Sequence, residues 1–140
     1  MNYALPSFDV NFTSNLMKAI NGEYHAICFY EQLAKQAPNE TVQKQILEIR
    51  QDEIRHFQEF SHLYICLTGQ QPSTHLTEPL PSDFRSGVVA AFKDEQETVD
   101  FYHTVARNIR DPFIQNTFEH AAADEQNHAV WFLYFMTPVL

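Results

Sequence analysis

The chain has 140 residues, a net charge of −9 and a pI near 5.1. This length suits one domain with a sizeable core, and the lack of low-complexity tracts argues against disorder. The acidic charge excludes nucleic acid and anionic membranes as expected partners, and the longest apolar run, Ala129 to Met136, is too short to span a bilayer. Because the N-terminus also lacks the basic-then-apolar pattern of a secretion signal, we expect a cytoplasmic protein.

The first predicted element after the N-terminus is a helix. Residues 1–12 contain Pro6 and no clear period, which predicts an extended N-terminal arm. From Thr13 or Ser14, either of which can cap a helix, apolar residues recur every three or four positions until Pro38. The resulting stripe is Leu16, Ile20, Glu23, Ile27, Tyr30 and Ala34.

A second helix is predicted from Asn39 to Gly69, because the same spacing continues and glycine is a natural helix stop. Its stripe is Val42, Ile46, Ile49, Glu53, His56, Phe60, Leu63 and Leu67. Residues 69–82 follow and contain three prolines, so we expect an extended connection there.

The third and fourth helices follow the same pattern. Ser82 is the expected cap of the third helix, whose stripe is Phe84, Val88, Ala91, Glu95, Thr98, Tyr102, Val105 and Ile109. Asp111 and Pro112 form a cap followed by proline at the first helical position. The fourth stripe is closed by Pro138 and consists of Ile114, Phe118, Ala121, Glu125, His128, Phe132 and Phe135.

Ionisable residues interrupt every one of these apolar stripes. Such groups in a core cost several kcal/mol unless they are paired or bound to a metal. A shift of 72 residues places the first half of the chain on the second, and the matching pairs are Glu23 and Glu95, Tyr30 and Tyr102, Asp52 and Asp124, Glu53 and Glu125, His56 and His128, and Phe60 and Phe132. This internal repeat predicts two equivalent helical hairpins related by a pseudo-twofold axis.

The spacing and the short turns predict an all-α four-helix bundle over residues 13–140, built from hairpins 13–68 and 82–137. Suppose that the second and third helices are parallel and that their ionisable residues lie at the same height along the bundle. Given the helical rise, the link between the two helices must then cover about 40 Å. The extended segment 69–82 reaches about 46 Å. The sequence therefore predicts one long crossover along the bundle, between the second and third helices.

Four carboxylates and two imidazoles are predicted to meet at one level of this bundle. Without cations the carboxylates would repel one another, and most would have to be protonated. Hard carboxylate oxygens with one imidazole per metal suit iron or manganese. We therefore assign ligands to two metal ions, with Glu23 and His56 on one, Glu95 and His128 on the other, and Glu53 and Glu125 as bridges.

This pattern resembles the ferritin-like di-iron carboxylate family in Glu23, Glu53-x-x-His56, Glu95 and Glu125-x-x-His128, over nearly the whole chain past residue 12. Within that family it is most similar to rubrerythrin and its small relatives that lack the rubredoxin domain. The resemblance implies two iron ions per chain, with manganese as an alternative. It also implies a peroxidase or ferroxidase reaction with peroxide or O2, in oxidative-stress defence or iron homeostasis. Cys28 and Cys66 form no Cys-x-x-Cys motif, so electrons must come from an external donor.

Residues around the ligands have predicted supporting roles. Tyr30 and Tyr102 lie two turns beyond Glu23 and Glu95, and the resemblance implies that their hydroxyls bond a ligand carboxylate, against the alternative of plain core aromatics. Two further hydrogen bonds are predicted to fix the histidine tautomers, Asp52 with His128 and Asp124 with His56. The alternative for both aspartates is a solvated position.

Several positions leave alternatives open. Arg55 lies off the ligand face and is interpreted as part of a surface ion pair. Gly22 either widens access to the site or permits close packing. Rubrerythrins carry a further glutamate where this chain has Thr98, and the aromatic residues 131–135 predict a homodimer interface or packing under the N-terminal arm.

Other functions compatible with the same residues are also considered. The main alternative is a non-catalytic protein that binds or stores iron or manganese. A structural or interaction protein could keep the metals only for stability, and an oxygenase would need an apolar pocket beside them. For the six ligands themselves, the alternative is a buried network of paired charges.

Overall fold

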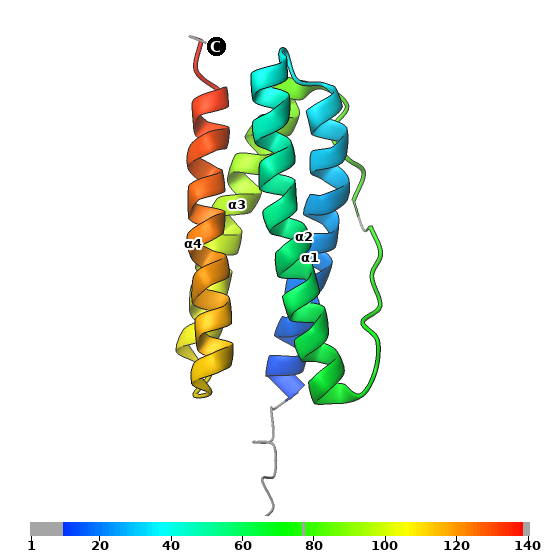
Figure 1. Cartoon of the computed structure of the whole chain (residues 1–140), viewed down its shortest axis with the longest axis vertical. Helices are drawn as coiled ribbons and strands as arrows, with labels where there is room; N and C mark the ends of the chain where they lie inside the picture. The colour runs from blue at the N-terminus through cyan, green and yellow to red at the C-terminus, as the bar shows by residue number, and fades with distance from the viewer. Residues whose placement is uncertain (1–9, 77, 139–140) are drawn as a thin grey trace, which may run out of the picture.

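The computed structural model describes residues 10–76 and 78–138. Its helices are α1 (Val10–Lys35), α2 (Glu40–Thr68), α3 (Phe84–Arg107) and α4 (Pro112–Phe135). They lie side by side as a four-helix bundle (Figure 1), and no strand occurs in the described ranges. The predicted all-α bundle is therefore confirmed. None of the described helices is long and apolar enough to cross a membrane.

Local side-chain chemistry sets most of the helix ends. Asn39 caps α2 by accepting a hydrogen bond from the Val42 amide at 3.0 Å, and Asp111 caps α4 through Ile114 in the same way. Gly69 ends α2 in the left-handed region, with φ of 70°, where glycine has no Cβ penalty. These three predicted ends are confirmed.

Two predicted helix starts are wrong. The arm was predicted over residues 1–12, but α1 already begins at Val10, and residues 1–9 lie outside the described ranges. The earlier start buries Phe12 against Phe118, with ring centroids 6.3 Å apart. At α3 the cap is Asp83 rather than Ser82, because the Asp83 carboxylate accepts from the Ser86 amide at 2.9 Å.

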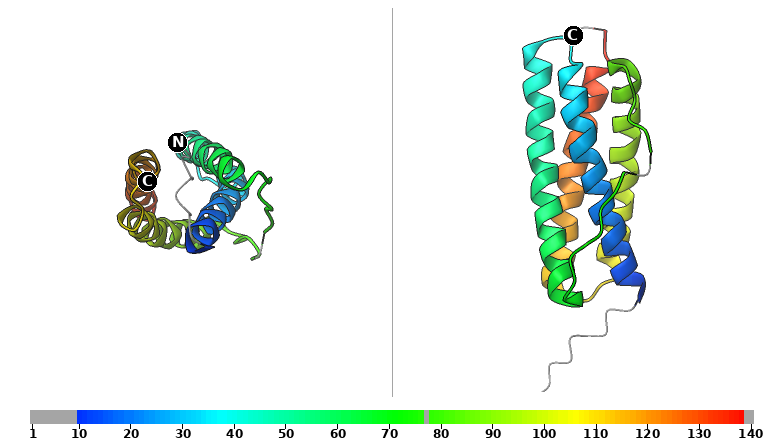
Figure 2. Two further views of the ribbon diagram at one scale, coloured as in Figure 1. Left: turned by 90° about the horizontal axis from the view of Figure 1, so that it is seen from below. Right: turned by 90° about the vertical axis from the view of Figure 1, so that its right-hand side faces the viewer.

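The bundle is built from two antiparallel hairpins. Helix α1 packs mainly on α2, and α3 packs mainly on α4. The crossover runs the length of the bundle, from the end of α2 to the start of α3 (Figure 2). Gln32 of α1 and Gln36 just after it hold the last residues of the crossover, since their amides donate to the carbonyls of Pro81 and Ser82 at 2.9 and 3.0 Å. The predicted long crossover is confirmed.

A polar layer separates two apolar halves of the core. One cluster gathers around Phe60 and Phe118, and the other around Leu33, Ile46 and Phe132. Among the described residues, six polar or charged side chains are buried between them, and these are Glu23, Glu53, His56, Glu95, Glu125 and His128. The fold thus places all six predicted ligands at one level.

Candidate metal centre

Every helix contributes to the buried polar layer. Helix α1 supplies Glu23, α3 supplies Glu95, and α2 and α4 each supply a Glu-x-x-His pair, whose members share one helix face. All six side chains are at most 2 % exposed. Burial of this many ionisable groups is expensive unless something compensates their charge.

The six side chains form two overlapping sets whose donor atoms lie within 4.8 Å of one another. One set is Glu23, Glu53, His56 and Glu125, and the other is Glu53, Glu95, Glu125 and His128. Glu53 and Glu125 belong to both sets. The described residues therefore bring together the whole predicted ligand group.

Each of the six side chains leaves one buried polar atom without a hydrogen bond. These atoms are Glu23 Oε2, Glu53 Oε1, His56 Nδ1, Glu95 Oε2, Glu125 Oε1 and His128 Nδ1. They nevertheless face one another closely, since His56 Nδ1 lies 3.0 Å from Glu125 Oε1 and 3.3 Å from Glu53 Oε1. On the other side, His128 Nδ1 lies 3.4 Å from Glu53 Oε1. Buried polar atoms are rarely left unpaired, and this donor set fits metal ions.

Tyrosines from the opposite hairpin hold two of the carboxylates. The Tyr102 hydroxyl donates to Glu23 Oε1 at 2.5 Å, and the Tyr30 hydroxyl donates to Glu95 Oε1 at 2.6 Å. Burial and the nearby carboxylates raise the pKa of both phenols well above the usual value, so both remain neutral donors. Each bond leaves the other oxygen of its glutamate directed into the centre.

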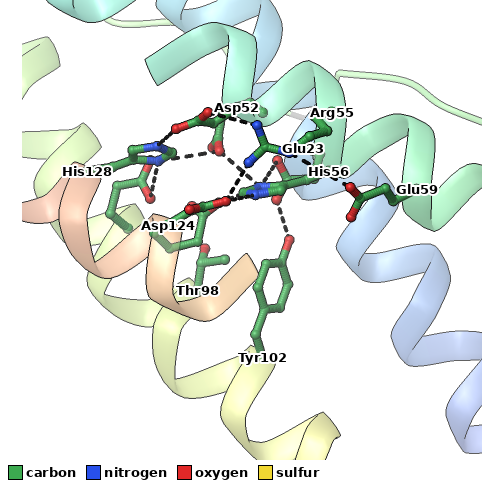
Figure 3. A network of polar contacts seen from close by, with 12 residues as sticks. Glu23, Asp52, Arg55, His56, Glu59, Thr98, Tyr102, Asp124 and His128 are labelled. Atoms are coloured by element: carbon green, nitrogen blue, oxygen red, sulfur yellow. Dashed lines mark hydrogen bonds and ion pairs between the residues drawn. The ribbon is translucent and has the colours of Figure 1, made fainter. Parts of the chain in front are cut away.

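The histidines are oriented by aspartates across the bundle (Figure 3). His56 Nε2 lies 2.7 Å from Asp124 Oδ2, and His128 Nε2 lies 2.8 Å from Asp52 Oδ2. Because an ionised carboxylate only accepts, each Nε2 carries a proton and donates it. In the neutral ring Nδ1 then holds the free lone pair that a metal requires. Both predicted aspartate–histidine pairs are present.

Arg55 links both aspartates, which sequence reasoning did not foresee. Its guanidinium lies 2.6 Å from Asp124 Oδ2 and 3.1 Å from Asp52 Oδ1, and Figure 3 shows it between them. The predicted ion pair exists, but it belongs to the support of the histidines rather than to an isolated surface contact. The repeat offers only the neutral Asn127 at the equivalent position, so this part of the site is not symmetric.

The carboxylates crowd one another strongly when no cation is present. Burial and the charges of Glu23 and Glu95 raise the pKa of Glu53 to about 8, and burial likewise raises the pKa of Glu23 and Glu125. Burial opposes protonation of His56, but Asp124 and the facing glutamates raise its pKa to about 12. Protons thus compensate the charge that metal ions would otherwise neutralise.

A cavity of about 370 Å³ lies between α1 and α3 and reaches the centre. All four glutamates of the polar layer line it. Thr98 also faces this cavity, and its hydroxyl donates to the Asp94 carbonyl at 2.7 Å instead of reaching the centre. The carboxylate side of the site is therefore open to a small molecule.

Together, the bundle and its polar layer define a helical protein with a buried carboxylate–histidine centre suited to metal binding. Comparison with known proteins gives the family, since the rubrerythrin pattern matches residues 14–79 and 88–139. This chain belongs to the rubrerythrin family.

One sequence relative and one solved structure extend this comparison. YhjR of Bacillus subtilis (strain 168), described as an uncharacterized protein, is 54% identical over 122 residues, covering 87% of this chain and 84% of that protein. A hypothetical protein from Pyrococcus furiosus has the same fold, with a TM-score of 0.80 and 17% identity. That alignment covers 94% of this chain and 92% of the other.

Proposed function

We propose that this protein is a di-iron oxidoreductase that reacts with peroxide or O2, as a rubrerythrin-like peroxidase or ferroxidase. Glu23 and His56 would bind one iron ion, Glu95 and His128 would bind the other, and Glu53 and Glu125 would bridge the two. Carboxylate oxygens with one imidazole for each ion suit iron, with manganese as the alternative. Membership of the rubrerythrin family supports this assignment.

The observation that carries the proposal is the set of six unpaired buried atoms. Each predicted ligand contributes one such atom. In the metal-free protein, protons held among these atoms compensate their charge, as the 3.0 Å separation of His56 Nδ1 and Glu125 Oε1 allows. A pair of cations satisfies all six at once, because Glu53 and Glu125 reach both positions.

Two bound ferrous ions would supply two electrons, which with two protons reduce hydrogen peroxide to two waters. The residues of the chain prepare the site for this chemistry. The aspartates hold both imidazoles with Nδ1 inward, and the tyrosines fix Glu23 and Glu95. The cavity beside Thr98 admits the small oxidant. An external donor then returns the electrons.

Stopped-flow oxidation of the ferrous protein tests this function. We expect the iron-loaded protein to be oxidised on mixing with peroxide or O2, at two ferrous ions per chain. Glu53→Gln removes a bridging carboxylate and should abolish loading of the second ion, whereas Glu48→Gln alters an exposed carboxylate of the same helix and should not. Two bound ions without oxidation by either reagent would instead indicate a non-catalytic metal-binding or storage protein.

We also propose that the protein acts as a homodimer in the cytoplasm. Helix α4 carries three exposed apolar side chains near its end, Val130, Leu133 and Tyr134, with 58, 52 and 49% exposure. Such a patch is suited to burial against a second copy. None of these three side chains lines the cavity between α1 and α3, so an interface formed by them would leave its lining residues uncovered.

A further inference from the structure

The two open sides of the metal centre differ in chemistry. Between α1 and α3, the cavity wall contains all four glutamates, each with an unpaired buried oxygen. Between α2 and α4, a second cavity is lined by His56, Arg55 and Asp124 but by none of these glutamates. There the imidazole and the guanidinium are already hydrogen-bonded, and the guanidinium repels a cation. The cavity between α1 and α3 is therefore the suitable approach for a positive ion.

Three carboxylates and one ammonium group, that of Lys18, line the outer part of this cavity. Glu78 from the crossover and Asp94 and Glu97 from α3 line it, and all three are exposed. His25 from α1 lines the same cavity. Carboxylates at the mouth of a cleft raise the local concentration of cations and speed their association.

Gly22 lies in the wall of this approach. A Cβ built on Gly22 meets no atom within 4 Å, although the residue lies on α1 beside Glu23 and lines the cavity. Close packing therefore does not explain the glycine. Of the two alternatives that the sequence left open, wider access to the site is the one that remains. A larger side chain at this position would occupy space at the cavity wall.

We propose that divalent cations reach the metal centre through the cavity between α1 and α3, and that Glu78, Asp94 and Glu97 bind them transiently at its mouth. The cation continues inward to the unpaired oxygens of the four glutamates. This inference rests on the proposed function, because the metal centre is the destination of the ion.

Rapid mixing with Co²⁺, followed by its absorbance, tests the role of the mouth. The double variant Asp94→Asn/Glu97→Gln should load about tenfold more slowly than the wild type and lose much of its salt dependence. Its final stoichiometry should stay at two ions per chain. The control Glu48→Gln/Asp100→Asn removes the same charge from exposed positions outside the cavity and should load normally. Equal loading rates in the two double variants would overturn the proposal.

Variants of Gly22 test the path itself. Gly22→Leu should slow both loading and chelator-driven release of Co²⁺ by a similar factor, leaving the affinity unchanged, while Gly22→Ala should resemble the wild type. Wild-type rates in Gly22→Leu would contradict the path. If the wild-type protein binds no Co²⁺, Mn²⁺ or Fe²⁺, the proposed function itself is wrong. If it binds these ions and the variants load at wild-type rates, only the proposed path is wrong.

Discussion

Arg55 is the residue whose role changes most between sequence and structure. It contacts Asp124 at 2.6 Å and Asp52 at 3.1 Å, and these aspartates orient the two histidines. Asp124 Oδ2 accepts hydrogen bonds from both Arg55 and His56. Asp52 instead accepts from Arg55 through Oδ1 and from His128 through Oδ2. The two histidines therefore have different support, although the repeat makes them equivalent in sequence.

Loss of this arginine should weaken metal binding. We expect Arg55→Gln to lower the affinity for Fe²⁺ or Co²⁺ about tenfold, because partners of ligating histidines typically contribute that much. The metal affinity of Arg55→Lys should lie between those of the wild type and Arg55→Gln, because one ammonium group cannot bind two carboxylates as a planar guanidinium does. Competition titration with a chelator measures the affinity. Arg85→Gln, an exposed arginine at the start of α3, is the control, and equal affinity in both glutamine variants would contradict this role.

The residue scale also shows what the sequence can and cannot predict. The ligand group was predictable because its members interrupt apolar stripes at a spacing that occurs twice. Arg55 lies off the stripe of its own helix and faces a partner 69 positions away on α4. Contacts of this kind depend on how the two hairpins are placed against each other, which local periodicity does not report.

At the scale of the helices, two glycines inside helices have opposite environments. A Cβ on Gly22 would meet open space, whereas a Cβ on Gly87 would lie 2.6 Å from Leu33 Cδ1, a fully buried side chain. Glycine within a helix costs about 1 kcal/mol relative to alanine. Only Gly22 is therefore free of a packing requirement.

Alanine at these two positions should separate helix propensity from packing. Gly22→Ala should raise the free energy of unfolding by about 0.5 to 1 kcal/mol. Gly87→Ala should give no such gain, because Leu33 must shift to accept the new methyl group. Chemical denaturation of the metal-free protein provides the comparison. If Gly87→Ala raises the free energy of unfolding as much as Gly22→Ala does, the Leu33 side chain shifts without an energetic penalty, which would contradict this prediction.

Helix ends were predictable where neighbouring residues determine them. Asn39, Gly69 and Asp111 act within their own turns, so their roles are readable from sequence. The start of α1 instead depends on Phe12 meeting Phe118, which lies on α4. At the start of α3, Ser82 and Asp83 are both good caps by residue type, and the sequence prediction of Ser82 was wrong because it is the Asp83 carboxylate that accepts from the Ser86 amide.

At the scale of the whole molecule, buried protonation makes stability depend on pH. The pKa of Glu53 rises from an ordinary value of 4.5 to about 8 in the folded state, and the pKa of His56 rises from 6.5 to about 12. In both cases the folded state binds the proton more tightly. Their stabilising contribution is therefore complete below the unfolded pKa and is lost as the pH rises through the folded value.

The metal-free protein should accordingly lose thermal stability as the pH rises from 5 to 9. Bound metal replaces these protons, so the loaded protein should show a much smaller decline. Thermal unfolding with a chelator, and separately with Mn²⁺, measures both trends. A melting temperature that increases with pH in the presence of chelator would contradict the raised pKa values. Asp124, whose pKa is lowered, titrates below this range and does not alter the sign.

The overall architecture followed from counting along the chain. The interrupted apolar stripes and the 72-residue repeat predicted the ionisable side chains at one level, and the length of segment 69–82 predicted a crossover. Both features are present in the bundle, with the crossover held against α1. The cavity between α1 and α3 was not predictable, because its shape depends on the separation of the hairpins.

The central claim is that six buried side chains bind two metal ions between the hairpins. Anomalous scattering at the iron edge, measured on crystals of anaerobically iron-loaded protein, tests it most directly. The account predicts two iron peaks per chain, one among Glu23, Glu53, His56 and Glu125 and one among Glu53, Glu95, Glu125 and His128. A single peak, no peak at this level, or iron bound elsewhere would contradict it.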